Sequence, residues 1–181
     1  MNKFGITTVA TIGIIIFLFS FNFTFASEIT SENVINNINS IRKQNSLSEL
    51  NVNPALQLAA YEKSVDMIVR NYFDHYAFGL TPWMFIKNKG YDYSIAGENL
   101  AMGFSTSEGV VNAWMNSPGH RANILNPEYE DIGVGVVKGT FAENGISKPT
   151  TMTTKFLAKP KSLSQTVYEK VINNIEKMFS K

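Results

Sequence analysis

Residues 132–136 read Ile-Gly-Val-Gly-Val, and this stretch decides the fold class of the chain. Its first, third and fifth side chains are apolar and alternate with glycine, which is the two-residue period of a β-strand. Glycine inside a strand lets a helix or another backbone approach the sheet closely. A second β-rich run covers 150–158, and we expect a loop over 141–149 to connect the two. The sequence therefore predicts a pair of antiparallel strands late in the chain.

Helix signals fill the chain before this sheet. Side chains that cap a helix, most of them followed by proline in the first turn, mark the expected starts at Thr30-Ser31, Asn53-Pro54, Thr81-Pro82, Thr106 and Ser117-Pro118. The second of these helices carries an apolar stripe that we expect to face the core. This stripe consists of Leu58, Tyr61, Val65 and Ile68. No helical period is present over 91–102. Helices followed by paired strands predict an α+β fold in which helices cover an antiparallel sheet.

The first 26 residues have the layout of a secretory signal. A positive start at Lys3 precedes an uncharged apolar run over 6–19, and small side chains stand at Thr24 and Ala26. We predict cleavage after Ala26, which leaves no transmembrane span in the mature chain. The apolar run also approaches the roughly 20 residues that cross a bilayer, so an uncleaved anchor is the alternative.

Three segments follow from these patterns. We predict a signal peptide over 1–26, a domain over 27–158 and an amphipathic C-terminal helix over 159–181, docked on the domain or on a partner. The net charge of +1 gives no reason to expect a nucleic-acid partner, which requires a basic stripe. The chain contains no Cys, which excludes thiol proteases and Cys-ligated metals and predicts a secreted domain free of disulfides.

Only two histidines exist, and both lie in irregular surroundings. His75 stands in an aromatic loop, and His120 follows the helix break at Ser117-Pro118. Imidazole is a common ligand for zinc and titrates near neutral pH. Glu98, between Gly97 and Asn99, is a third candidate. Residue types alone favour structural roles for all three, because a lone histidine is more often a hydrogen-bonded structural residue than a ligand.

Three motifs in order change this interpretation. They are Gly97-Glu98-Asn99-Leu100-Ala101, then Trp-Met-Asn-Ser-Pro-Gly-His-Arg-Ala-Asn-Ile-Leu over 114–125, then the strand at 132–136. Together they resemble the CAP superfamily of SCP-like extracellular domains, and the middle motif resembles its bacterial branch most. The resemblance covers about 33–158. It implies an α-β-α sandwich with a central antiparallel sheet flanked by helices, an extracellular location, and a cavity lined by two His and two Glu.

By motif position, His75 and His120 match the family's two histidines, and Glu98 matches its first glutamate. A divalent ion such as Zn²⁺ is associated with the two histidines in some members, so the resemblance implies His75 and His120 as a weak metal pair, with Glu98 behind them. The second glutamate position holds Ser117 here. Glu108 precedes Ser117 by nine residues, which at about 100° per residue puts the two on opposite helix faces. We therefore interpret Glu108 as a helix-start charge rather than a cavity residue.

Three functions of different kinds follow. The first is a secreted binding module whose cavity holds a divalent metal, a small molecule, a lipid, a peptide or another cell-envelope component. The second is a metal-dependent hydrolase acting on peptide or cell-envelope substrates, with Glu98 as base. The third is a scaffold in which His75, Glu98 and His120 only stabilise the fold. The missing glutamate and the absence of a nucleophile motif leave catalytic residues unassigned.

Overall fold

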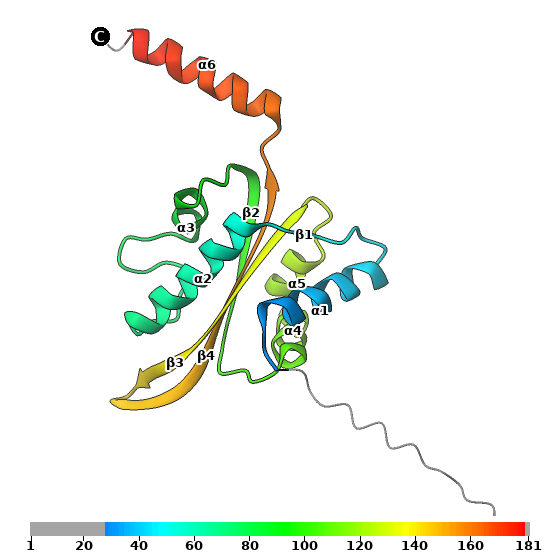
Figure 1. The fold of residues 1–181 in the computed structure, drawn as a ribbon, viewed down its shortest axis with the longest axis vertical. Helices are drawn as coiled ribbons and strands as arrows, with labels where there is room; N and C mark the ends of the chain where they lie inside the picture. The colour runs from blue at the N-terminus through cyan, green and yellow to red at the C-terminus, as the bar shows by residue number, and fades with distance from the viewer. Residues whose placement is uncertain (1–27, 180–181) are drawn as a thin grey trace, which may run out of the picture.

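The computed structural model describes residues 28–179, and the predicted signal peptide lies outside them. Within these residues the chain has six helices and four strands, and all of them except the last helix form one sandwich (Figure 1). In chain order they are α1 (Ser31–Gln44), β1 (Asn51–Val52), α2 (Pro54–Val69), α3 (Pro82–Asn88), β2 (Tyr93–Met102), α4 (Ser107–Asn116), α5 (Pro118–Ile124), β3 (Asp131–Glu143), β4 (Ile146–Pro160) and α6 (Leu163–Phe179).

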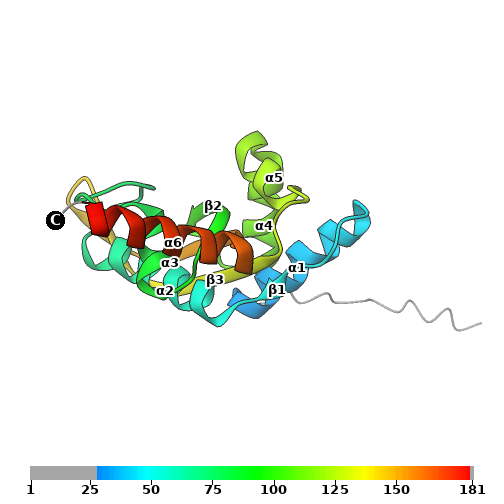
Figure 2. The same ribbon diagram turned by 90° about the horizontal axis from the view of Figure 1, so that it is seen from above.

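The sheet has the order β1-β3-β4-β2. The short β1 runs parallel to β3, and the other pairs are antiparallel. Helices α2 and α3 cover one face, while α1, α4 and α5 cover the other, as the two views in Figures 1 and 2 show. This is the expected α-β-α sandwich, with one parallel pair added at the edge of the sheet.

Helix α2 packs on β3 through glycine, as the Gly-Val-Gly pattern predicts. A Cβ added at Gly133 would overlap the backbone of Leu56, and one at Gly135 would overlap that of Ala60. The helix therefore lies directly on the strand, and Ser64 Oγ donates a 3.1 Å hydrogen bond to the Gly135 carbonyl. Contact this close needs small side chains on the inner face of the helix.

The predicted core stripe of α2 is wrong for this reason. Leu58 is 57% exposed and Tyr61 is 51% exposed, while Val65 and Ile68 are half-buried. The face that meets the sheet instead carries Leu56, Ala59, Ala60, Lys63, Ser64 and Met67. The buried face has small side chains at its centre, Ala59, Ala60 and Ser64, where the helix meets the glycine strand.

The expected loop over 141–149 is also wrong. Strands β3 and β4 continue through it and turn at Asn144-Gly145, whose φ angles are 51° and 79°. Positive φ at both central residues is the geometry of the two-residue hairpin turn that Asn-Gly favours. The strands therefore form one long hairpin.

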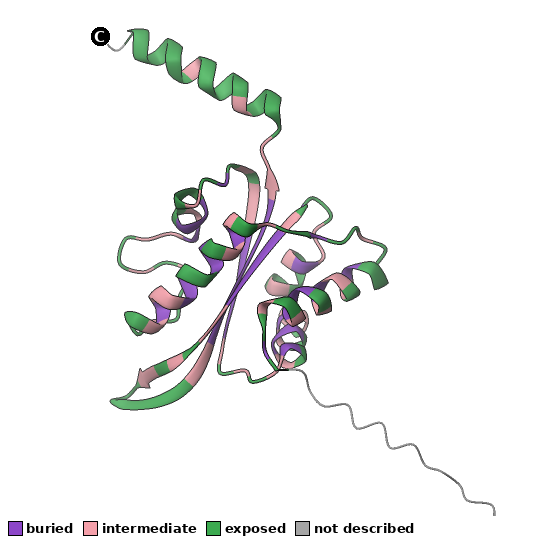
Figure 3. Cartoon of the chain, in the orientation of Figure 1, coloured by how far each residue is buried: buried purple, intermediate pink, exposed green. Residues whose placement is uncertain are grey.

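Helix α6 lies outside the sandwich. Figure 1 shows it extending away from the domain, and Figure 3 shows most of its length exposed. It begins with a reciprocal cap, in which Ser162 Oγ accepts from Gln165 N–H and Gln165 Oε1 accepts from Ser162 N–H. It has no buried residue, so it does not dock on the domain. Within residues 28–179, every helix is too short or too polar to cross a membrane.

Candidate functional site

The site lies along β2, a strand that the sequence patterns did not reveal. Residues 97–101 are all buried, so the polar–apolar alternation that marks a half-exposed strand is missing. Neighbouring side chains of a strand point to opposite faces. Glu98 pairs with Phe156 and points toward the α2–α3 layer, while Asn99 points toward α4 and α5. Strand β2 therefore presents side chains to both helical layers.

The free edge of β2 is closed by side chains from the neighbouring helices. Asn123 of α5 donates a 3.1 Å hydrogen bond to the Glu98 carbonyl. Trp114 of α4 donates its indole N–H to the Leu100 carbonyl at 2.9 Å. These two bonds fix where α4 and α5 lie along β2. They therefore also fix the position of the side chains on these helices, including His120.

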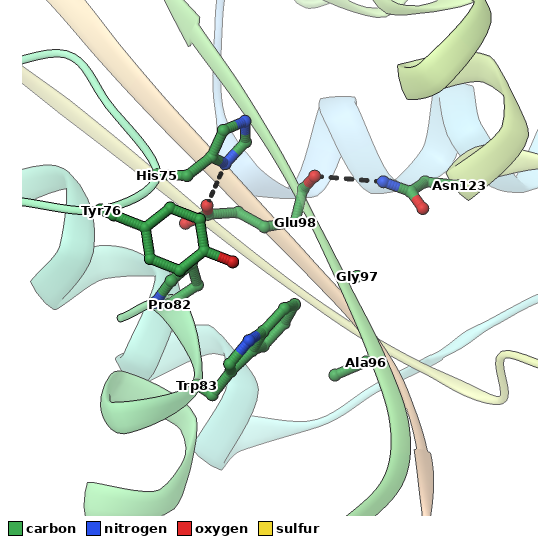
Figure 4. A pocket seen from close by; sticks show the side chains of 8 residues that line it. All are labelled: His75, Tyr76, Pro82, Trp83, Ala96, Gly97, Glu98 and Asn123. Carbon is green, nitrogen blue, oxygen red and sulfur yellow. Dashed lines mark hydrogen bonds and ion pairs between the residues drawn. The ribbon is translucent and has the colours of Figure 1, made fainter. Parts of the chain in front are cut away.

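His75 and Glu98 form the centre of the site. His75 Nδ1 lies 2.5 Å from Glu98 Oε2, and Figure 4 shows the two groups turned toward each other. The imidazole is 44% exposed, whereas the carboxylate is 2% exposed. The hydrogen bond to Glu98 raises the pKa of His75, and burial raises the pKa of the Glu98 carboxyl. Because both pKa values are raised, the proton shared by His75 and Glu98 is bound more tightly than it would be without these shifts.

The second carboxylate oxygen of Glu98 is a buried acceptor without a donor. Among residues 28–179, no group donates a hydrogen bond to this Oε1 atom. The carboxylate borders a pocket of about 300 Å³. This pocket, the dyad pocket, is lined by His75, Tyr76, Pro82, Trp83, Ala96, Gly97, Glu98 and Asn123. A buried acceptor beside aromatic side chains favours a ligand that has both a hydrogen-bond donor and an apolar face.

His120 lies in a neighbouring, more apolar pocket of about 370 Å³. Asn99 donates to the His120 carbonyl at 3.0 Å and so links this histidine to β2. Burial lowers the pKa of His120, and the charges of Lys155 and His75 lower it further. Within the described chain, no hydrogen bond joins the His120 ring to His75 or Glu98. The structure thus pairs two of the three predicted residues and places the third next to them.

Ser117 and Glu108, the two positions considered for the second family glutamate, border different pockets. Ser117 borders the same pocket as His120, although its side chain makes no capping bond to α5. Glu108 lies in the first turn of α4 and borders a different pocket, shared with Asn37 and Ile41 of α1. Glu108 therefore does not replace the missing glutamate.

Sequence reasoning missed two contributors. Asn123 lies inside α5 and also donates to Asn99 Oδ1 at 2.8 Å. Asn123 lies three residues after His120, so both side chains are on one face of the helix. This spacing in the sequence could have indicated that Asn123 lies near the site. Trp83 is half-buried and borders the dyad pocket, a position that no local sequence pattern indicates.

The donor set does not fit a resident zinc centre. Among residues 28–179, no group of three or more His, Asp or Glu side chains is placed to hold a metal ion. A His75–His120 site would offer two imidazoles, whereas zinc sites in proteins use about three or four protein ligands. Weaker association of a divalent ion with this pair stays a prediction.

Comparisons with known proteins agree with this architecture. The model of the Cysteine-rich secretory protein family (CAP) matches residues 35–147, more than half of the chain. YkwD from Bacillus subtilis (strain 168) is 46% identical over 107 residues, which are 58% of this chain and 41% of that protein. The chain thus spans about two fifths of that relative.

Two solved structures share the fold. An extracellular protein containing an SCP domain from Bacillus anthracis str. Ames is 26% identical with a TM-score of 0.61, over 71% of this chain and 40% of that one. An outer surface protein from Borrelia burgdorferi is 25% identical with a TM-score of 0.61, over 76% of this chain and all of that one (100%).

Proposed function

Because the chain belongs to the Cysteine-rich secretory protein family (CAP), we propose that it is an exported binding module whose dyad pocket holds a ligand through Glu98. The ligand class has a hydroxyl or amide N–H donor next to an apolar face, as glycan and peptide parts of a cell envelope have. Glu98 accepts the ligand's donor, and the rings of Tyr76 and Trp83 cover its apolar face.

One observation carries this proposal. Glu98 Oε1 is buried and lacks a donor within the described chain, while the other oxygen is bound to His75. A buried acceptor without a partner costs about 1–3 kcal/mol of folding free energy. A ligand that donates to this atom recovers part of that cost, so the site is prepared for binding.

Hydrolysis has less support from the same geometry. Proton transfer and charge stabilisation require separate groups, and Ser117 occupies the position of the second family glutamate. One carboxylate oxygen of Glu98 is also engaged by His75, so this atom is not available to take a proton from water. We therefore propose binding without turnover.

Binding is tested through the two tryptophans of the chain. Titration with chitotriose or with a capped alanine tripeptide, followed by ¹⁵N-HSQC NMR, is expected to shift the indole signal of Trp83 and leave that of buried Trp114 in place. Glu98→Gln is expected to weaken the Kd about tenfold, because a charge-assisted hydrogen bond becomes a neutral one.

Glu108→Gln is the matched control, since it removes a carboxylate that borders a different pocket. Its Kd is expected to equal that of the unchanged protein. Failure of both probes to shift Trp83, or equal affinity in the Glu98 variant, would sink the proposal.

Export is the second part of the proposed function. It is supported by the sequence pattern over 1–26 and by the descriptions of the Bacillus anthracis and Borrelia proteins as extracellular and outer-surface. When the full chain is expressed in a Gram-positive host, N-terminal sequencing of protein from the medium is expected to begin at Ser27. Recovery of the chain in the membrane fraction with residues 1–26 attached would show an anchor instead.

A further inference from the structure

Lys63 is a fully buried cation beneath the site. It stands on the inner face of α2, with 0% of its surface exposed. Its ammonium group donates to the Asp74 carbonyl at 2.9 Å, the His75 carbonyl at 3.1 Å and Tyr72 Oη at 3.1 Å. A lysine ammonium has three donors, and all three are used here.

These bonds reach the loop that carries His75 and no other part of the described chain. The loop connects α2 to α3, and both Asn71 and Phe78 have φ of 53°. A non-glycine residue in the left-handed region costs about 1 kcal/mol or more, so contacts elsewhere must hold this conformation. The bonds from Lys63 lie between the two strained positions.

Burial lowers the pKa of Lys63, and the aromatic rings and acidic groups around the ammonium oppose this shift. The ammonium lies 4.8 Å from the centre of the Tyr72 ring and 5.5 Å from that of Phe85. Tyr72 in turn donates to Asp66 Oδ2 at 2.6 Å, which links α2 to the same loop a second time. Glu98 is the acidic group with the largest favourable effect on Lys63, so the cation also supports the carboxylate of the dyad.

We propose that Lys63 is the positioning residue of the site, which ties the His75 loop to α2 and so holds the imidazole against Glu98. The inference rests on the proposed function, because it concerns the group that presents Glu98 to a ligand. Helix α2 packs directly on the glycines of β3. The hydrogen bonds of Lys63 therefore fix the His75 loop relative to the sheet as well as to the helix.

The test compares Lys63→Met with Lys155→Met, without ligand. Lys155 is the matched control, since it is also a fully buried lysine in the sandwich, and its Nζ has no hydrogen-bond partner within residues 28–179. Two measurements are made at constant pH: the ¹⁵N shift of His75 Nδ1, which reports its bond to the carboxylate, and hydrogen exchange of amides 73–78.

Lys63→Met is expected to remove the Nδ1 signature and to speed exchange over 73–78 by about tenfold or more relative to the rest of the domain, the factor that one charged hydrogen bond represents. Lys155→Met is expected to change neither. A Lys63 variant that keeps the signature and the slow exchange overturns the proposal, as does an equal change in both variants.

If Lys63→Met does not fold, Tyr72→Phe removes one of the three acceptors and keeps the ring. The same changes are then expected on a smaller scale, and unchanged values overturn the proposal. Because no ligand is present, these results are independent of probe binding. Loss of the signature in a protein that binds neither probe would keep the positioning role and end the proposed function.

Discussion

Gly135→Ala is expected to destabilise the domain by at least ~3 kcal/mol, the upper range for overpacking a core. The added Cβ would overlap the backbone of Ala60 and Tyr61 in α2. Backbone cannot rotate away as a side chain can, so the whole helix must move off β3. That movement breaks the Ser64 bonds to the Gly135 carbonyl and to Thr154. Urea unfolding followed by circular dichroism measures the loss.

Gly119→Ala is the control for this variant. Gly119 lies in α5, and a Cβ there meets nothing within 4 Å. Alanine also favours a helix over glycine by about 1 kcal/mol. The control is therefore expected to be neutral or slightly stabilised. A Gly135 variant as stable as the Gly119 variant would show that α2 does not rest on the strand as described.

Arg42→Met is expected to cost about 3–5 kcal/mol, because it leaves buried carbonyl groups without donors. Arg42 is fully buried at the end of α1. Its guanidinium donates to the carbonyls of Ser48 at 2.9 Å, Ile124 at 2.8 Å, Asn126 at 2.8 Å and Tyr129 at 3.4 Å. Ile124 is the last residue of α5, so this side chain also fixes the helix that carries His120.

Lys155→Met provides the contrast. Burial lowers the pKa of Lys155 well below its usual value, which means that the folded state disfavours the charged form. The folding free energy lost in this way at neutral pH is regained when methionine replaces the lysine, so this variant is expected to be as stable as the original or more so. Equal destabilisation of the Arg42 and Lys155 variants in urea would contradict the role assigned to the guanidinium bonds.

The parts of the fold that were predictable from the sequence are those marked by residues with a special effect on the backbone, such as glycines in a strand and side chains that cap a helix. Gly133 and Gly135 indicated a strand that another element approaches closely, and α2 lies on it. Side-chain caps gave the helix starts, such as Thr30, which accepts from Asn33 N–H at 3.1 Å. The hairpin of β3 and β4 was also predictable, because Asn144-Gly145 is a strong signal for a two-residue turn.

Predictions from hydrophobicity alone were less successful. Leu58 and Tyr61 are apolar at helical spacing, yet they face outward, because the helix meets Gly133 and Gly135 through its backbone at Leu56 and Ala60. Strand β2 gave no alternation, because both of its faces are covered in the middle. Helix periodicity in α6 correctly indicated an amphipathic helix, but the pattern does not say what its apolar face contacts.

The pairing in the site could not be derived from local patterns. His75 and Glu98 are separated by 23 positions, and they meet where the loop bound by Lys63 passes β2 at the edge of the sheet. Family resemblance named the three residues, but it could not show that Asn123 borders the pocket of His75 and Glu98, or that Glu98 keeps one oxygen without a donor in the described chain.

The two margins of the sheet determine how the protein behaves when crowded. An unprotected outer strand is a template for edge-to-edge aggregation between molecules. Here the two-residue β1 covers β3 only at Asp131 and Ile132, while on the other margin the β2 carbonyls of Glu98 and Leu100 are occupied by Asn123 and Trp114. The middle of β2 is therefore protected against edge-to-edge pairing with a second molecule, whereas β3 beyond Ile132 has no strand on that side within the described residues.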